Sequence, residues 1–415
     1  MKKIISIIII NIIIISNPFT VYSFDESALI KEFKKKFEKN KEIDIVAVGD
    51  IMVHGPQLRA QYDLKNKLYS FEDNFKYIKK YIERADIALC NLETTLLGYE
   101  PYTSYPKFNS PDNLVDALKN SGFDIISTAN NHSFDTKAIG MFRTVDVLLN
   151  KGLDVIGTRN DNYNKDYIIK EVKGVKVAFT SFTYETKKYG KNKTINGIVL
   201  PKKYETYINT FSYYNLENDL KKMEKIIKKM KKEKVDLIIF FFHWGNEYHN
   251  QPNEHQKLIA KKLSSYGVDI ILGSHPHVIQ PITIIKNEFG KETAVVYSMG
   301  NFLSNQRYEN VKNRSAEDGI VVDFKIIKSY KGEVSIKKIS YIPTWVYKRY
   351  INGKRDYKIL PLIHNNNELK KLVGEEANLN RALNSRKNTT NLIEYNKGIG
   401  QIKVYNPLED IDDKQ

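Results

Sequence analysis

The feature of this sequence that most constrains its fold is the alternation of short apolar segments with amphipathic ones. Apolar runs such as "IDIVAVG" and "LIIFFF" have the length and composition of buried strands. Between such runs lie segments with helical spacing, and in one of them Leu216, Leu220, Met223, Ile227 and Met230 share a face. Strands that alternate with helices build an α/β architecture, in which the strands are buried and largely parallel.

The alternation runs through most of the chain. We expect strands at residues 43–50, 86–93, 123–132, 153–157, 175–182, 235–245, 268–277, 293–302, 320–327 and 334–342. We expect helices at residues 71–85, 111–122, 139–152, 216–234 and 254–267. The last strands follow one another without clear helices, which predicts a second or mixed sheet packed on the first.

The N-terminal segment predicts export of the protein. Two lysines precede a nearly unbroken apolar stretch from Ile4 to Ile15, which is too short for an easy membrane span. Ser23 then offers a small-residue cleavage site. We therefore interpret residues 1–23 as a cleaved signal peptide, with an uncleaved N-terminal anchor as the alternative. Either interpretation places the main domain outside the cytoplasm.

The rest of the chain divides into three parts by composition. Residues 24–41 are polar and predict a helical lead-in, and residues 42–345 carry the alternating pattern of the main domain. From residue 346 onward the chain turns polar, so we expect residues 346–415 to form a peripheral C-terminal region. Cys90 is the single cysteine, which excludes an intramolecular disulfide.

Charge indicates the kind of partner. The formal net charge is +16, and without residues 1–23, which hold two lysines and no acidic residue, it is +14. A basic protein outside the cytoplasm suits anionic partners such as a membrane surface, wall polymers or polyglutamate. A lysine-rich composition bias is the alternative. No segment resembles a nucleic-acid-binding module, and export argues against a nucleic-acid partner.

Polar side chains follow five of the predicted strands. Ligands of open α/β sheets bind beyond the carboxyl ends of the strands, so we expect these side chains to meet at one edge. Carboxylates, amide oxygens and imidazoles together suit Mn, Fe or Zn better than Ca, which predicts a site for one or two divalent ions. Separate strand-end caps and core polar groups are the alternative. The residues are Asp50, Asn91, Glu93, Asn130, Asn131, His132, His243, His275 and His277.

Six short stretches carry a family resemblance: "VGDIM", "NLET", "ANNHSFD", "FFHWGNEY", "GSHPHVIQP" and "YSMGNF". In this order they resemble the capsule synthesis CapA family, whose domain is similar to the calcineurin-like metallophosphoesterases. The resemblance covers roughly residues 42–345. It implies a metallophosphoesterase-like layered α/β sandwich, with helices packed on two mixed β-sheets, and a role in the synthesis or export of a poly-γ-glutamate capsule.

The resemblance also implies a ligand set for two metal ions. Asp50 and His277 would hold one ion, and Glu93 would bridge it to the second, in place of the aspartate usual in the phosphoesterases. The remaining ligands of the second ion would be Asn131, His243 and His275.

Further residues would act beside the metal. His132 matches the histidine that serves as general acid or orients the substrate, and Asp135 would steady it. Four residues are candidates for substrate binding, although the two aromatic ones have packing as an equal alternative. They are Trp244, Glu247, Tyr248 and Asn301.

The chain departs from the phosphoesterase pattern at one point. Those enzymes carry Asp-x-His at the first strand, whereas this chain has Asp50-Ile51-Met52. A thioether cannot replace an imidazole for a hard metal ion, and His54 lies four residues from Asp50. We therefore expect the first ion to be held weakly or not at all.

Three functional hypotheses follow. The leading one is an extracytoplasmic CapA-type protein that acts, through its metal site, in synthesis, export or processing of an anionic capsule or wall polymer. The second is a metal-dependent phosphoesterase or amide hydrolase that acts on wall or capsule material. The third is a non-catalytic scaffold that partners a membrane polymerase. The implied ligands favour the first two hypotheses, and Met52 favours the third.

Overall fold

The computed structural model describes residues 40–351, 353–395 and 404–405. The predicted signal peptide and nearly all of the predicted helical lead-in lie outside the described residues. Lys41–Lys328 and the described residues from Val334 onward belong to one compact unit, which holds both large sheets. None of the helices within these ranges has the length and apolar character that a membrane span requires.

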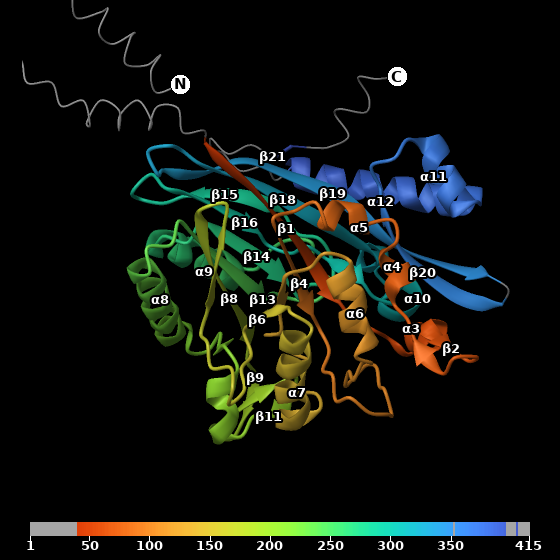
Figure 1. Ribbon diagram of the computed structural model, residues 1–415, viewed down its shortest axis with the longest axis horizontal. Coiled ribbons are helices and arrows are strands. Elements are labelled where there is room, and N and C mark those ends of the chain that lie inside the picture. The colour runs from red at the N-terminus through yellow and green to blue at the C-terminus, as the bar shows by residue number, and fades with distance from the viewer. Residues whose placement is uncertain (1–39, 352, 396–403, 406–415) are drawn as a thin grey trace, which may run out of the picture. The chain divides into compact units, whose positions relative to one another are not determined.

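The first sheet has nine strands within the described ranges (Figure 1). Its main path, in spatial order, is β20 (Lys354–Pro361), β19 (Val334–Ile351), β18 (Asp318–Lys328), β1 (Lys41–Ile51), β4 (Ile87–Leu92), β5 (Ile125–Ser127) and β6 (Asp154–Ile156). On one side of β1, the neighbouring pairs β1–β4, β4–β5 and β5–β6 are parallel. On the other side, the pairs β1–β18, β18–β19 and β19–β20 are antiparallel. Two short strands pair outside this path, β17 (Asn301–Leu303) with β1 and β21 (Val404–Tyr405) with β19.

The second sheet has seven strands within the same ranges. Its path is β12 (Thr210–Phe211), β8 (Val175–Tyr184), β13 (Leu237–His243), β14 (Ile270–Ser274), β16 (Glu292–Val296) and β15 (Ile282–Lys286), and β7 (Ile168–Val172) pairs with β8. All pairs along β12, β8, β13, β14 and β16 are parallel. Short strands form two small sheets, β9 (Thr186–Tyr189) with β10 (Asn192–Ile195) and β11 (Ile198–Val199), and β2 (Tyr62–Asp63) with β3 (Leu68–Tyr69).

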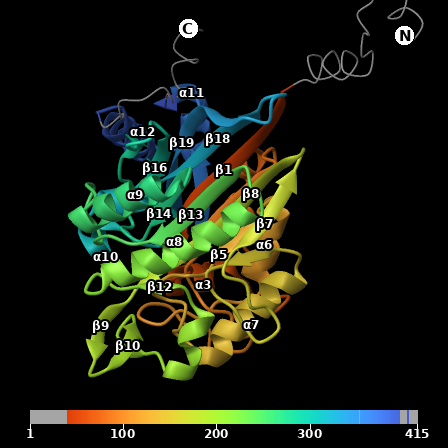
Figure 2. The ribbon, with the colours of Figure 1, turned by 90° about the vertical axis from the view of Figure 1, so that its left-hand side faces the viewer.

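Helices cover the sheets and connect the strands (Figures 1 and 2). The α-helices are α3 (Gly55–Gln61), α4 (Glu72–Phe75), α5 (Lys79–Ile82), α6 (Asn113–Asn120), α7 (Lys137–Asn150), α8 (Leu216–Lys232), α9 (Glu254–Tyr266), α10 (Tyr308–Val311), α11 (Asn366–Val373) and α12 (Glu376–Tyr395). Two 3₁₀ helices are η1 (Lys202–Tyr207) and η2 (Arg314–Glu317). Helices α8 and α9 lie over β13 and β14 (Figure 2), and their apolar faces form one core cluster with the second sheet.

The two-residue period of β13 sets the layers of the protein. Leu237, Ile239 and Phe241 belong to the core shared with the first sheet, whereas Ile238 and Phe240 belong to the core shared with α8 and α9. Successive side chains of a strand point to opposite faces, so a strand that is apolar throughout must be covered on both sides. The continuous apolar run in the sequence therefore indicates the observed sandwich.

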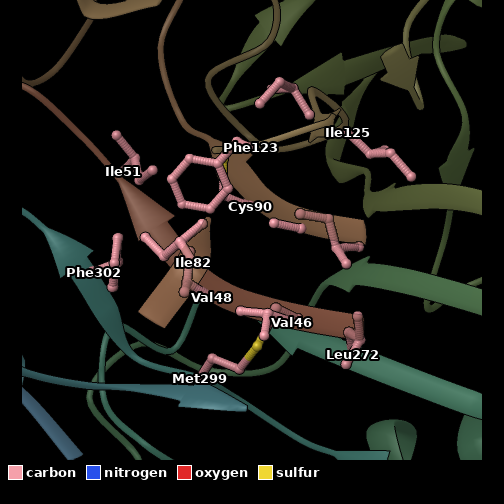
Figure 3. Close-up of a cluster of buried hydrophobic side chains, with 14 of the residues drawn as sticks. Val46, Val48, Ile51, Ile82, Cys90, Phe123, Ile125, Leu272, Met299 and Phe302 are labelled. Atoms are coloured by element: carbon pink, nitrogen blue, oxygen red, sulfur yellow. The ribbon is translucent and has the colours of Figure 1, made fainter. Parts of the chain in front are cut away.

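The central core lies around β1 and reaches from one sheet to the other. Val46, on β1, shares this core with Phe123, which precedes β5, and with Leu272, on β14 of the second sheet (Figure 3). Cys90, predicted to be a buried strand residue, is fully buried on β4 in the same cluster. The layered α/β sandwich with two mixed sheets that the resemblance implied is confirmed.

Of the late strands, those at residues 320–327 and 334–342 make the first sheet mixed and do not form a second sheet of their own. β18, β19 and β20 extend the first sheet beyond β1 through successive antiparallel pairs, and the second sheet begins with β7 and β8. The predicted strand at residues 293–302 is two strands, because β16 belongs to the second sheet and β17 pairs with β1 of the first. Residues 297–300 therefore connect the two sheets.

The domain boundary predicted after residue 345 is wrong. It falls inside β19, and β20, α11 and α12 continue the same unit (Figure 1). An apolar cluster joins these elements through Trp345, Tyr347, Leu360, Leu369 and Leu379. In this segment the buried apolar side chains occupy alternate strand positions and one face of each helix, so the average composition of residues 346–415 is polar. A boundary predicted from average composition was therefore misplaced.

The helix predicted at residues 71–85 is also interrupted. It consists of α4 and α5, between which the Ile78 N–H donates to the Phe75 carbonyl over three residues. Phe71, Phe75, Ile78 and Ile82 are nevertheless all buried, at the spacing that predicted the helix. The apolar periodicity identified the buried face correctly, but it did not predict that the helix is interrupted.

Gly49 allows β1 and β17 to approach closely, so Gly49→Ala should destabilise the fold. A Cβ atom at this position would lie 2.0 Å from the carbonyl oxygen of Gly300. We expect the free energy of unfolding, measured by urea denaturation, to fall by about 1–3 kcal/mol or more. Gly55→Ala is the matched control, because its Cβ would meet its nearest atom at 3.4 Å. Equal stability of the two variants would contradict the prediction.

Candidate metal centre

Five strand ends converge where the two sheets meet. β1 packs against β14, which brings the carboxyl ends of both sheets together. The five strand ends meet, as expected, and they come from two different sheets. Each converging residue is at most 5% exposed. The first sheet contributes Asp50, Asn91, Glu93, Asn131 and His132, and the second contributes His243, His275 and His277.

Asp50 is a fully buried carboxylate with several partners. Its Oδ1 accepts a hydrogen bond of 2.8 Å from the Asn91 amide, and its Oδ2 accepts one of 3.2 Å from the His275 backbone N–H. His277 Nδ1 also lies 3.2 Å from Oδ2. Burial by itself would raise the pKa of Asp50, but His277, His243 and Asn91 together outweigh it and lower the pKa. Asp50 is therefore held as a carboxylate.

Glu93 is buried without such partners. Neither carboxylate oxygen accepts a hydrogen bond from the described residues. Glu93 Oε1 lies 3.4 Å from His243 Nε2, 3.9 Å from His277 Nε2 and 4.0 Å from His132 Nε2. Burial and then the charge of Asp50 raise the pKa of Glu93 well above its usual value. A buried carboxylate facing three imidazoles needs a cation or a proton as its counterpart.

His243 is fixed at both ring nitrogens. Its Nδ1 lies 3.0 Å from Ser274 Oγ, and its Nε2 lies 2.7 Å from Asn131 Oδ1. Burial lowers the pKa of His243 to about 3. A neutral imidazole beside an amide oxygen is a pair of ligands suited to a divalent ion, and such an ion would replace the hydrogen bond between them.

His275 and His277 lie on the loop after β14. Both have backbone φ in the left-handed region, 95° and 56°, which non-glycine residues rarely adopt. Burial and then the neighbouring His243 lower the pKa of His275 well below its usual value, and His275 Nδ1 is buried without a hydrogen-bond partner. For His277, burial opposes protonation, but Glu93 and Asp50 outweigh it and raise the pKa to about 9.

The side chains present fit a divalent cation. Unpaired buried atoms on Glu93 and His275 point to a missing partner, and mixed oxygen and nitrogen donors suit Mn, Fe or Zn. Among the described residues, three sets of side chains could hold a metal ion. Within each set, the potential ligand atoms lie within 4.8 Å of one another. The three sets are Glu93 with His243 and His275, Asp50 with Glu93 and His277, and Glu247 with His275 and His277.

His132 and Asp135 lie beside this cluster in contact with each other. His132 Nδ1 lies 2.7 Å from Asp135 Oδ2, which also accepts a hydrogen bond of 2.6 Å from the Phe108 backbone N–H. The His132 ring packs edge-on against Phe108. The contact directs His132 Nε2 toward Glu93. Asp135 is thus placed where the resemblance implied, and the catalytic role of the pair stays a prediction.

Met52 stands where the phosphoesterases carry a histidine, and His54 does not replace it. Met52 is 1% exposed and shares the wall of a pocket with His277. His54 Nδ1 accepts a hydrogen bond of 3.2 Å from the Asn305 backbone N–H, and its ring packs against Phe108. His54 is in none of the three ligand sets. The set of Asp50, Glu93 and His277 is nevertheless assembled without it.

Two predicted substrate-binding residues are buried, which corrects the prediction. Trp244 is 0% exposed, stacks on Phe242 in the core against α8 and α9, and donates from its indole to the Tyr297 carbonyl. It follows His243 directly in the chain and so points to the opposite side. Asn301 is also 0% exposed, and its Oδ1 lies 3.2 Å from His277 Nδ1. Asn301 orients His277 and has no free surface for a substrate.

Glu247 and Tyr248 do line an opening to the cluster. Together with His132 and His277 they form part of the wall of a pocket of about 470 Å³. Tyr184 was missed by the sequence reasoning, although its ring centroid lies 4.7 Å from that of His275. Because β8 is parallel to β13, the position of Tyr184 at the end of β8 was the available signal.

The two packed mixed sheets, with buried carboxylates and imidazoles at their strand ends, define a layered α/β protein with a candidate metal centre. The chain belongs to the family of the bacterial capsule synthesis protein PGA_cap, whose family model matches residues 44–306.

Two curated relatives support the assignment to this family. The chain is 29% identical over 285 residues to the capsule biosynthesis protein CapA of Bacillus anthracis, which covers 67% of this chain and 64% of the relative. It therefore spans slightly less than two thirds of that relative's length. It is 28% identical over 298 residues to the PGA biosynthesis protein CapA of Bacillus subtilis (strain 168), which covers 70% of each chain.

Solved structures resemble the chain more distantly. A 5'-nucleotidase precursor from Thermus thermophilus matches with 14% identity and a TM-score of 0.42, over 77% of this chain and 54% of that one. The calcineurin-like phosphoesterase YfkN from Bacillus subtilis matches with 16% identity and a TM-score of 0.39, over 86% of this chain and 99% of that one.

Glu93→Gln should stabilise the metal-free protein. The substitution keeps the shape of the side chain and removes a buried carboxylate that has no hydrogen-bond partner. We expect the free energy of unfolding, measured by urea denaturation in EDTA at neutral pH, to rise by about 1–3 kcal/mol. Glu254→Gln, at an exposed position on α9, is the control and should change stability little. A loss of stability in Glu93→Gln would show that the carboxylate has favourable partners without metal.

Proposed function

We propose that this protein is an extracytoplasmic capsule-polymer protein that binds a divalent metal ion and uses the site to act on an anionic polymer such as poly-γ-glutamate. The observation that carries the proposal is Glu93, whose two buried oxygens accept no hydrogen bond from the described residues and whose Oε1 faces the imidazoles of His132, His243 and His277. Family membership and the two relatives named for capsule and PGA biosynthesis support the polymer class.

A basic groove beside the metal site supports an anionic substrate. A pocket of about 920 Å³ has Arg59, Lys65 and Lys354 on its wall together with three tyrosines, Tyr62, Tyr69 and Tyr102. The one acidic residue of this wall, Asp63, accepts hydrogen bonds from the Asn66 side chain and from the Lys65 and Asn66 backbone. Cations with aromatic rings between them suit a chain of repeated carboxylates.

The groove and the metal-site pocket are neighbours. His54 and Tyr105 line the metal-site pocket, while the adjacent residues Gly55 and Ser104 line the groove. A polymer that lies along the groove would therefore reach the ligand cluster. A single small ester would need only the metal-site pocket, so the extended groove beside it favours a polymeric substrate.

Hydrolysis is the second candidate function, favoured by the His132–Asp135 pair. Asp135 holds the Nδ1 side of the ring, so His132 Nε2 faces the pocket and can donate a proton to a leaving group. When bound, a divalent cation supplies Lewis acidity, which activates water and polarises the bond under attack. If the protein binds metal and polymer but does not cleave the polymer, the hypothesis of a non-catalytic scaffold applies instead.

Metal content tests the site. His243→Ala and His275→Ala should each weaken Mn²⁺ or Zn²⁺ binding by about 10-fold or more, since loss of an outer-sphere partner alone costs this much. On the sequence pattern alone, in which nothing replaces the imidazole at Met52, His277→Ala should cost less. The measurement is bound metal by mass spectrometry after dialysis against trace metal, with His364→Ala as the control at a residue that pairs with Glu368. Wild-type protein without stoichiometric metal would overturn the metal site.

Polymer retention tests the groove. Binding to immobilised poly-γ-glutamate should weaken as salt increases, because exposed charges are screened over about 10 Å at about 0.1 M salt. Arg59→Gln combined with Lys65→Gln should reduce retention at low salt more than Lys225→Gln combined with Lys232→Gln, which removes the same charge from the exposed side of α8. If the two double variants lose retention equally, nonspecific charge attraction accounts for polymer binding and the groove has no special role.

A further inference from the structure

The loop that carries Glu247 is tied to the loop that carries His275 and His277. The Tyr248 backbone N–H donates a hydrogen bond of 2.7 Å to the Pro276 carbonyl, which lies between the two histidines. The Gln280 side chain donates hydrogen bonds of 2.8 and 3.1 Å to the carbonyls of residues 249 and 251. Glu247 is exposed, yet its backbone is fixed from both sides against the histidine loop.

The position of Glu247 matches that of a metal ligand. One of its carboxylate oxygens lies within 4.8 Å of a nitrogen of His275 and of a nitrogen of His277. His275 belongs to the same ligand set, and its Nδ1 is buried without a hydrogen-bond partner among the described residues. The following residue, Tyr248, has a φ of 61°, a left-handed value that is strained for a tyrosine and found mainly at functional sites.

We propose that Glu247 is a ligand of the bound metal and supplies, from the open side of the site, the donor that Met52 cannot provide. Glu247 and Met52 both lie on the wall of the pocket that opens over His277. The family pattern assigned the loss of a ligand to Met52, and the structure places the Glu247 carboxylate on the same pocket wall. This assignment rests on the metal binding proposed above.

The exchange of an imidazole for a carboxylate has a chemical consequence. With Glu247, the cluster offers three carboxylates, from Asp50, Glu93 and Glu247, beside its histidines. Carboxylates favour harder ions such as Mn²⁺, whereas imidazoles favour Zn²⁺. Loss of Glu247 should therefore weaken Mn²⁺ binding more than Zn²⁺ binding.

The first experiment measures metal affinity of the full chain by competition with a chromogenic chelator. Glu247→Gln should weaken Mn²⁺ binding by about 10-fold or more, as expected for a direct ligand. Glu254→Gln removes another exposed carboxylate, which belongs to none of the three ligand sets, and should leave the affinity unchanged. Because Glu247 is exposed, its variant should keep the urea unfolding transition of the wild type, so a loss of affinity cannot come from misfolding.

The second experiment tests whether Glu247 takes the role of the missing histidine. In the Glu247→Gln background, Met52→His should restore Mn²⁺ or Zn²⁺ affinity by about 10-fold, because it returns an imidazole to the pocket wall beside His277. Met52→Leu in the same background should restore nothing. Failure of Met52→His, with an unchanged urea transition, would overturn the claim that the two positions serve the same ion.

The outcomes separate this assignment from the proposed function. If wild-type protein binds stoichiometric metal and Glu247→Gln binds it with equal affinity, Glu247 is no ligand and the proposed metal site stands. If wild-type protein binds no Mn²⁺ or Zn²⁺ while its urea transition is intact, both the metal site and the assignment of Glu247 are overturned.

Discussion

The burial of two carboxylates where the two sheets meet is the constraint on which the rest of the site depends. Asp50 and Glu93 are both 0% exposed, and an unpaired buried charge is costly. Asn91, the backbone of His275 and the ring of His277 compensate Asp50. Among the described residues, the Glu93 carboxylate accepts no hydrogen bond and faces imidazole nitrogens at 3.4 Å or more, so a cation could complete the site.

The apolar cores make such a place possible because they hold the strands in register around it. On β13, one set of alternate residues packs toward the first sheet and the other toward α8 and α9. His243 falls in the first set and reaches the cluster, whereas Trp244 falls in the second and anchors the helices. The same alternation that makes the sandwich stable thus decides which polar residues can reach the site.

The loops that carry Tyr248, His275 and His277 make the site rigid. Tyr248, His275 and His277 all have φ in the left-handed region, and hydrogen bonds between their two loops hold them there. A strained backbone that is fixed by its surroundings keeps ligand atoms in place without metal. Membership of the PGA_cap family connects this preformed cluster with capsule synthesis proteins, and the groove proposed to bind the polymer lies beside it.

The sequence by itself determined the α/β class, the buried strands and the polar residues that follow them, because apolar periodicity and strand-end placement are local properties. Asp50, Glu93, Asn131, His243, His275 and His277 do lie together as the resemblance implied. Only the tertiary structure decided that these residues come from two sheets, that β18 to β20 extend the first sheet, and that the domain continues past residue 345. It also placed Glu247 beside the histidines and Trp244 in the core. These outcomes depend on pairing between segments far apart in the chain, which no local pattern specifies.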